Sequence, residues 1–214
     1  MTRPPVYITI EGVIGVGKTT LAQLLQAKYK AELVLETFEE NPFLASFYED
    51  PDRYAFQTQV VFLLSRFEQQ RTVEELVGKV PLISDYLFAK DQLFARLNLQ
   101  GAEWETYQRL CDALASRIVV PGLVIYLRAS VDTLMERIVQ RGRPYECSMP
   151  RDYILSLSHA YDTFFATYDA APLLVVEMDD LDIPERKADL ALVYEKVAAA
   201  LQRRLPLDLY RVET

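Results

Sequence analysis

The sequence contains few of the residues on which several classes of protein depend. It has one histidine, His159, and two cysteines, Cys111 and Cys147, among 214 residues. Two cysteines are too few for a disulfide scaffold, and none of these three residues stands at the spacing of a zinc site. No apolar leader follows Met1, and no apolar run approaches the roughly 20 residues that cross a membrane. We therefore expect a cytoplasmic protein without membrane spans.

Basic residues are also in the minority. Lys and Arg number 23 against 31 Asp and Glu, which gives a formal net charge of −8. A protein that binds nucleic acid by charge needs cations facing phosphates, so this balance disfavours a nucleic-acid partner. A small anionic ligand in a local basic pocket remains compatible with it. Half of the residues are hydrophobic, and the length suits one folded domain over residues 1–214.

Short apolar runs alternate along the chain with helical patterns. Runs typical of buried strands occupy 6–10, 33–35, 80–83, 123–127 and 173–177, and helical spacing marks 20–29, 52–77, 88–97, 103–119, 131–140, 151–168 and 184–201. This alternation predicts an α/β fold with a five-stranded parallel sheet flanked by helices. The segment 141–150, which contains one glycine and two prolines, is expected to form a mobile lid. The tail 203–214 has no periodicity and is expected to be disordered.

The strongest motif is a glycine-rich loop between the first strand and the first helix. Residues 12–19 read GVIGVGKT and match the phosphate-binding pattern G-x-x-x-x-G-K-[ST]. In such a loop the backbone N–H groups and the helix dipole face the phosphates of a nucleotide. Lys18 is expected to contact the β- and γ-phosphates, and Thr19 is expected to bind Mg²⁺. The motif therefore predicts the P-loop fold of nucleoside triphosphate hydrolases. It also predicts ATP and Mg²⁺ as cofactors. The expected donor contacts are Gly12, Gly15, Val16, Gly17, Lys18, Thr19 and Thr20.

Two acidic residues follow neighbouring strands. Asp85 ends the third strand and is a candidate ligand of Mg²⁺ or of an acceptor hydroxyl, although an aspartate there can also simply cap the next helix. Glu36 follows the second strand, and the carboxyl ends of strands in a doubly wound sheet share one crevice with the P-loop. A carboxylate there can accept the proton of an attacking hydroxyl and repels an acceptor that already carries phosphate. The pattern therefore favours phosphoryl transfer to a neutral alcohol, whereas the absence of Asn-Lys-x-Asp disfavours a GTPase.

Three arginines lie just before or at the start of the predicted lid. Arg137 and Arg141 lie one helical turn apart, and Arg143 follows Gly142. Cations in this pattern are typical of an arginine-rich lid that closes on the transferring phosphoryl group, although they can also simply complement a helix C-terminus. Gln59 and Arg66 share one stripe of the helix 52–77, and this pattern alone does not distinguish a binding role from a solvated surface.

Together these residues resemble the deoxyribonucleoside kinase family over about residues 5–200. The resemblance rests on GVIGVGKTT with Glu11 before it, Glu36, FYEDPDRY at 47–54, FQTQ at 56–59, Ser65-Arg66, Asp85 with Asp91, and RGRPYE at 141–146. The order and spacing of these pieces are most similar to the bacterial branch that acts on purine deoxynucleosides, deoxyadenosine or deoxyguanosine. Members of the family are commonly homodimers, and the resemblance implies a homodimer here.

The resemblance also implies roles that spacing alone does not supply. Glu36 is implied as the general base that deprotonates the sugar 5′-hydroxyl. The other implied contacts are Tyr48 and Glu146 with the 3′-hydroxyl, Gln59, Arg66 and Asp91 with the base, and Arg137, Arg141 and Arg143 with the donor phosphates. Many members carry an arginine after the acid of the third strand, whereas this chain reads Asp85-Tyr86-Leu87. We therefore expect Arg137 or Arg141 to neutralise the acceptor side of the phosphate.

Two alternatives compete with a deoxynucleoside kinase. A thymidylate-kinase-like nucleoside monophosphate kinase shares the P-loop, the acidic strand end and the arginine lid, but it needs a cation near Glu36 for the acceptor phosphate. The stretch 34–42 contains no Lys or Arg, which disfavours this alternative. A non-catalytic nucleotide-binding protein is expected to lose Lys18, Glu36 or Asp85, and all three are present.

Overall fold

The computed structural model describes residues 5–115, 117–143, 146 and 149–203. Residues 204–214 of the predicted tail 203–214 lie outside these described residues, and so do residues 144, 145, 147 and 148 of the predicted lid 141–150. Arg203, the first residue of the predicted tail, ends helix α8 (Lys187–Arg203). Within the described residues, none of the helices combines the length and the apolar composition needed to cross a membrane.

A parallel sheet forms the centre of the molecule. Its five strands within the described residues are β1 (Tyr7–Gly12), β2 (Glu32–Val34), β3 (Leu82–Ser84), β4 (Leu123–Arg128) and β5 (Leu173–Glu177). They stand in the order β2-β3-β1-β4-β5, and every neighbouring pair is parallel. All six residues of β1 are buried, as expected for a strand covered on both faces. The predicted five-stranded parallel sheet of an α/β protein is therefore confirmed.

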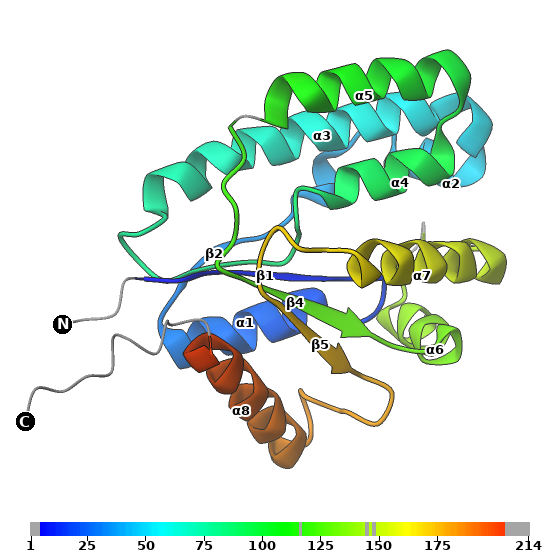
Figure 1. The fold of residues 1–214 in the computed structure, drawn as a ribbon. Coiled ribbons are helices and arrows are strands. Elements are labelled where there is room, and N and C mark those ends of the chain that lie inside the picture. Colours follow the sequence, from blue (N-terminus) through cyan, green and yellow to red (C-terminus); the bar gives the residue numbers. More distant parts are fainter. Residues whose placement is uncertain (1–4, 116, 144–145, 147–148, 204–214) are drawn as a thin grey trace, which may run out of the picture.

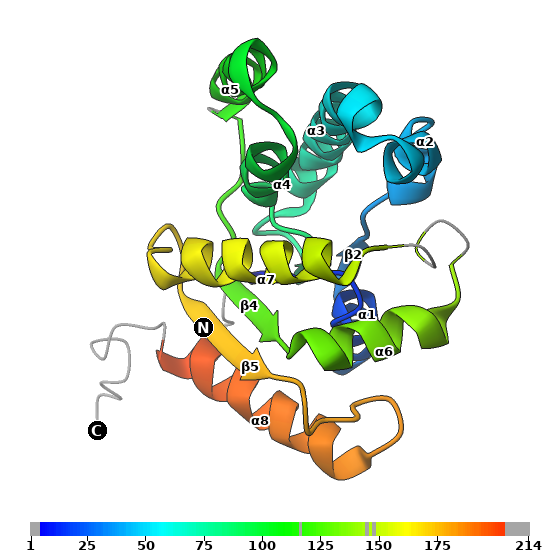
Figure 2. The same ribbon diagram turned by 90° about the vertical axis from the view of Figure 1, so that its right-hand side faces the viewer.

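Helices cover both faces of this sheet. They are α1 (Lys18–Tyr29), α2 (Leu44–Glu49), α3 (Pro51–Leu76), α4 (Lys90–Asn98), α5 (Gly101–Ala115), α6 (Val131–Arg141), α7 (Arg151–Ala166) and α8 (Lys187–Arg203), with a short 3₁₀ turn at Phe38–Glu40. Figure 1 shows α1 and α8 on one side of the sheet and α3, α4 and α5 on the other. Turned by 90°, Figure 2 shows α7 lying between the sheet and this upper helical layer, with α6 beside it.

The sequence prediction differs from the structure in two helical regions. The short helix α2 was not predicted, and it ends before Asp50 because Pro51 begins α3 at a position where proline starts a helix readily. The helix predicted over 103–119 ends at Ala115. A β-branched run leads into Pro121, which disfavours helical backbone before it, and the Val119 N–H donates to Oε1 of Gln70 at 3.2 Å.

The turn from β1 into the P-loop requires a residue without a side chain. Gly12 has a φ angle of +150°, and a Cβ atom there would lie 2.4 Å from the carbonyl oxygen of Leu127. Gly12 and Leu127 are register partners on the adjacent strands β1 and β4, so neither backbone can move away without breaking the sheet. The same Cβ atom would lie 3.0 Å from Cγ1 of Val16 inside the loop. The close approach of the two strands therefore fixes glycine at the first position of the P-loop.

This constraint predicts a large difference between two glycine-to-alanine substitutions. At Gly78 the φ angle is +77°, and no atom lies within 4 Å of an added Cβ atom. Gly78→Ala therefore introduces only the strain of left-handed backbone and is expected to lower the free energy of unfolding by about 1 kcal/mol. Gly12→Ala adds a backbone clash and is expected to cost about 3 kcal/mol or more. Urea unfolding of both variants measures the difference, and equal losses would contradict this account of Gly12.

Candidate active site

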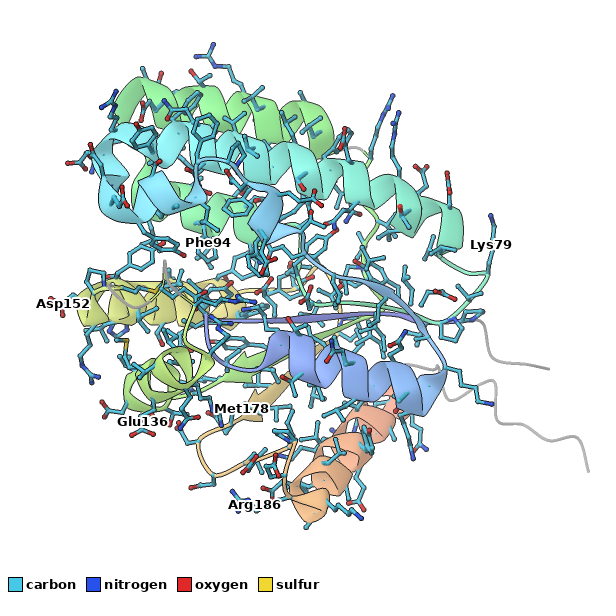
Figure 3. The ribbon with its side chains drawn as sticks, turned by 180° about the vertical axis from the view of Figure 1, so that it is seen from behind. Lys79, Phe94, Glu136, Asp152, Met178 and Arg186 are labelled. Atoms are coloured by element: carbon cyan, nitrogen blue, oxygen red, sulfur yellow. The ribbon has the colours of Figure 1, made fainter. Side chains whose placement is uncertain are left out.

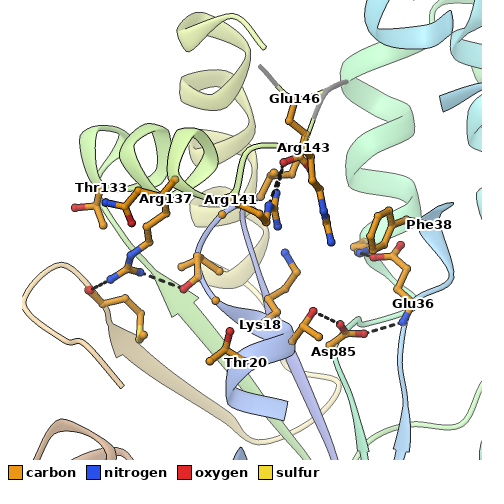
Figure 4. Close-up of a pocket in the computed structure, with 18 of the residues that line it drawn as sticks. Lys18, Thr20, Glu36, Phe38, Asp85, Thr133, Arg137, Arg141, Arg143 and Glu146 are labelled. Carbon is orange, nitrogen blue, oxygen red and sulfur yellow. Dashed lines mark hydrogen bonds and ion pairs between the residues drawn. The ribbon is translucent and has the colours of Figure 1, made fainter. Parts of the chain in front are cut away.

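A cavity of about 830 Å³ opens where the carboxyl ends of the central strands meet. Its lining includes the P-loop residues 14–20, Glu36 after β2, Asp85 after β3, and Gln59 and Arg66 from α3. Figure 4 shows Lys18, Glu36 and Asp85 facing one space, with the arginines of α6 and the lid above it. The predicted convergence of the strand ends on the P-loop is therefore present, as the crevice of a doubly wound sheet requires.

The P-loop places a cation at the start of α1. Nζ of Lys18 donates to the carbonyl oxygens of Gly12 at 2.7 Å and Val13 at 3.2 Å. Burial lowers the pKa of Lys18 to about 8, while the carboxylates of Glu11, Glu36 and Asp85 act in the opposite direction. Lys18 is half-buried and lines the cavity, so it favours an anionic ligand such as a phosphate. The predicted donor contacts from Gly15 to Thr20 all line the cavity, whereas Gly12 contributes its carbonyl oxygen to Lys18.

Asp85 connects the P-loop to the segment that follows β2. Its Oδ2 atom accepts a hydrogen bond from the Thr19 hydroxyl at 2.5 Å, and its Oδ1 atom accepts one from the backbone N–H of Glu36 at 2.8 Å. The structure thus brings together the two residues predicted to bind Mg²⁺. Both offer hard oxygen ligands, which suit an Mg²⁺ ion that keeps phosphate and water as its other ligands. Among the described residues, no group of three or more His, Cys, Asp or Glu side chains gathers into a metal site.

The carboxylate of Glu36 lies between two cations. Nε of Arg66 donates to Oε1 at 2.8 Å, with a further ion pair from Nη2, and Nζ of Lys90 donates to Oε2 at 2.6 Å. Burial alone would raise the pKa of Glu36, but the Arg66 guanidinium and the Lys90 ammonium hold this pKa well below its usual range. Glu36 is therefore an ionised carboxylate in the wall of the cavity.

Lys90 is the residue of this site that the sequence analysis missed. It is the first residue of α4, its side chain is 5% exposed, and it lines the same cavity as the P-loop. The stretch 34–42 contains no Lys or Arg, and the two cations come instead from α3 and α4. The sequence did hold a signal for Lys90, because this lysine directly precedes Asp91 and follows Asp85 by five residues. The expectation that no cation lies near Glu36 is therefore wrong, although both cations are paired with its carboxylate.

Two predicted base contacts carry buried oxygen atoms without a hydrogen-bond partner among the described residues. These atoms are Oε1 of Gln59 and Oδ2 of Asp91. Gln59 lines the cavity and is 2% exposed, whereas Asp91 stands behind Arg66 and forms an ion pair with it through Oδ1. Phe94 of α4 also lines the cavity and lies next to α7, edge-to-face with the ring of Tyr161 (Figure 3). The region beyond Glu36 therefore combines an aromatic wall with an unpaired amide oxygen.

The lid arginines meet a buried carboxylate. Arg141 donates to Oε2 of Glu146 from Nε at 3.1 Å and from Nη2 at 2.5 Å. Arg143 donates to Oε1 of Glu146 at 3.5 Å, and its guanidinium lies 4.2 Å from the centre of the Phe38 ring. Tyr48, the other predicted partner of the 3′-hydroxyl, lines the same cavity. The two arginines predicted to contact the donor phosphates are thus bonded to Glu146, which is predicted to contact the sugar.

Arg137 is bound differently from the other two arginines. Its guanidinium donates to the carbonyl oxygens of Val16 at 3.2 Å, Met178 at 2.9 Å and Leu181 at 3.0 Å. These bonds connect the P-loop to the segment that follows β5. In this conformation Arg137 holds two walls of the cavity together, and its contact with donor phosphates stays a prediction.

A carboxylate beneath the P-loop ties three parts of the site together. Glu11 is fully buried, and its Oε1 atom accepts hydrogen bonds from the N–H of Gly12 at 2.8 Å and the hydroxyl of Tyr161 at 2.9 Å. Its Oε2 atom accepts from the N–H of Leu87 at 2.7 Å. These bonds fix the P-loop relative to α7 and to the turn that carries Asp85. The sequence analysis gave Glu11 no role of its own, because both partner segments are distant along the chain.

Comparisons with known proteins agree with this geometry. The model of the family described as deoxynucleoside kinase matches residues 8–202. The chain is 34% identical over 199 residues to a deoxyguanosine kinase of Bacillus subtilis strain 168, covering 90% of this chain and 94% of that protein. It is 28% identical over 202 residues to a deoxyadenosine/deoxycytidine kinase of the same strain, covering 91% of this chain and 92% of that protein.

A solved structure shares the same architecture. The deoxyadenosine kinase of M. mycoides, solved with the products dCMP and a flexible dCDP bound, matches with a TM-score of 0.80 and 28% identity. The match covers 90% of this chain and 99% of that chain. The family match and these relatives also remove the support for a nucleoside monophosphate kinase. The chain belongs to the deoxynucleoside kinase family, and it is a phosphotransferase with an alcohol acceptor.

Proposed function

We propose that the enzyme transfers the γ-phosphate of ATP to the 5′-hydroxyl of a purine deoxynucleoside, deoxyadenosine or deoxyguanosine, in cytoplasmic nucleotide salvage. The observation that carries this proposal is the ionised carboxylate of Glu36, which faces the P-loop across one cavity and is joined through its own backbone to Asp85. A hydroxyl that enters between Glu36 and a γ-phosphate held at Lys18 has both a proton acceptor and an electrophile within reach.

The reaction is a displacement at phosphorus. The 5′-oxygen forms a bond to the γ-phosphorus, and the bond from that phosphorus to the β–γ bridging oxygen breaks, leaving its electron pair on the diphosphate. Glu36 accepts the hydroxyl proton, and Lys18 contacts the donor phosphates. Thr19 and Asp85 would hold Mg²⁺, which when bound offsets the negative charge of those phosphates.

The base-binding region favours a base with an N–H donor, which purines and pyrimidines both offer, so the choice of a purine rests on the relatives. Oε1 of Gln59 is buried, unpaired among the described residues and part of the cavity wall, so a base N–H would satisfy it. Guanine offers an amino group beside a ring N–H, and adenine offers an amino group. Several relatives act, by their names, on deoxyguanosine or deoxyadenosine, which supports the same choice.

The lid contacts connect donor binding to sugar binding. Arg141 and Arg143 are proposed to contact the donor phosphates, and Tyr48 and Glu146 the 3′-hydroxyl. Since Glu146 is bonded to both arginines, movement of these arginines toward phosphates changes the position of a sugar ligand.

We also propose a homodimer formed through the outer faces of α3 and α5. Leu64 on α3 is 50% exposed and Leu110 on α5 is 37% exposed. Burying such side chains in an interface stabilises association. This assembly is independent of the chemistry proposed above.

The substrate proposal predicts the outcome of a panel of acceptors offered with ATP and Mg²⁺. We expect kcat/KM for deoxyguanosine or deoxyadenosine to exceed that for thymidine at least about tenfold, because several relatives act, by their names, on these purine deoxynucleosides. Release of ADP and mass spectrometry of the 5′-monophosphate measure the turnover. Preference for deoxycytidine would overturn the purine assignment alone, whereas turnover of dTMP without any nucleoside would overturn the proposed reaction.

A second prediction concerns the proton acceptor. Glu36→Gln keeps the shape of the side chain but removes its basicity, so kcat is expected to fall at least about a hundredfold while the nucleoside still binds. Steady-state kinetics and calorimetric titration with deoxynucleoside measure the two effects. The matched control is Glu39→Gln, an exposed glutamate of the same segment, which should leave kcat unchanged. Near wild-type turnover of Glu36→Gln would exclude Glu36 as the base.

A further inference from the structure

The residue after Asp85 supplies no cation to the active site. Tyr86 is fully buried and packs in a hydrophobic cluster with Tyr7, Val34, Val73 and Leu82. The sequence analysis therefore assigned the neutralisation of the acceptor side to Arg137 or Arg141. In the structure Arg137 donates to three backbone carbonyl oxygens, and Arg141 pairs with Glu146. Neither arginine reaches the space next to Glu36 in this conformation.

Lys90 brings a cation into that space. Its ammonium lies 2.6 Å from Oε2 of Glu36, its side chain is 5% exposed, and it lines the cavity together with Lys18 and Asp85. Repulsion from Lys90 also contributes to the lowered pKa of Lys18, so the two ammonium groups are electrically close. A group with a charge of −1 or −2 placed between two lysines would be attracted by both.

The hydrogen bonds of Lys90 leave it free to bind a ligand. An ammonium group has three N–H donors, and within the described residues Lys90 donates one hydrogen bond, to Oε2 of Glu36. Glu36 does not depend on Lys90 alone, because Arg66 holds its other oxygen, Oε1, from two nitrogen atoms. Arg66 is itself held by Asp91 on α4. The structural pairing of Glu36 therefore belongs mainly to Arg66.

We propose that Lys90 is a catalytic residue whose ammonium donates a hydrogen bond to the transferring phosphoryl group from the acceptor side. This inference rests on the 5′-phosphoryl transfer proposed above and deepens it. As the bond from the 5′-oxygen to the γ-phosphorus forms and the bond to the β–γ bridging oxygen breaks, the electron pair remains on the diphosphate. The hydroxyl proton passes to Oε2 of Glu36, the atom that Lys90 releases when it turns toward a phosphoryl oxygen. Lys18 and Lys90 then contact the phosphoryl group from opposite sides.

The test compares two substitutions at Lys90 with a control. Lys90→Met keeps the length of the side chain without the charge, and kcat with the preferred deoxynucleoside is expected to fall at least about a hundredfold. The KM for the nucleoside should stay within about threefold of wild type, because Arg66 still holds Glu36. Lys90→Arg restores a cation and should be at least about tenfold faster than Lys90→Met. The control Lys79→Met removes an exposed lysine and should leave kcat and KM unchanged.

A second substitution replaces Lys90→Met if that variant does not fold. Thermal unfolding and calorimetric binding of the nucleoside establish whether Lys90→Met is folded. If it is not, Lys90→Gln takes its place, since its amide still donates to Glu36, and the same hundredfold loss in kcat is expected.

Several outcomes would overturn this role for Lys90. They are a kcat within threefold of wild type in the folded uncharged variant, a rise in KM with kcat unchanged, or a Lys90→Arg variant no faster than Lys90→Met. An active wild type with unaffected Lys90 variants overturns the role of Lys90 alone. A wild type that phosphorylates no deoxynucleoside overturns the proposed reaction, and the role of Lys90 with it.

Discussion

The active site depends on one buried arrangement of charges, the carboxylate of Glu36 held between Arg66 and Lys90. Each charge in this arrangement comes from a different element, namely the end of β2, the middle of α3 and the start of α4. Removing one partner of a buried pair leaves an uncompensated charge, which destabilises a protein strongly. The helical layer above the sheet is therefore tied to the strand ends by the same groups that take part in the proposed reaction.

The acidic composition of the chain has a structural counterpart in this site. Glu36 and Glu146 stand where an uncharged sugar is proposed to bind, whereas Lys18 and Arg137 stand beside the P-loop. This separation of acidic from basic groups is incomplete, because Arg66 and Lys90 lie beside Glu36 and pair with its carboxylate. A neutral acceptor can therefore approach a region whose charges largely cancel, while an anionic donor is attracted to the opposite wall.

The parallel sheet and the phosphate-binding loop could be predicted because each follows from a short motif or from the regular alternation of strands and helices. The P-loop needs only eight consecutive residues between a strand and a helix, and Thr19 and Asp85 meet because strands of a parallel sheet end at one edge. Lys90 and the backbone contacts of Arg137 were not predicted, because they depend on how α3, α4 and the segment after β5 pack. Tyr86 is a second example. The sequence showed that Tyr86 stands where many family members carry an arginine, but it did not show that Lys90, at the start of α4, brings a cation next to Glu36.

Glu36 and the P-loop are proposed to face a single deoxynucleoside from opposite sides. The most direct measurement is a crystal structure of the enzyme with deoxyguanosine and a non-hydrolysable ATP analogue. We expect the 5′-oxygen at hydrogen-bond distance from Glu36, the base edge at Gln59 and the γ-phosphate between Lys18 and Lys90. A nucleoside bound with its 5′-oxygen away from Glu36, while Arg66 and Lys90 still enclose that carboxylate, would contradict this proposal.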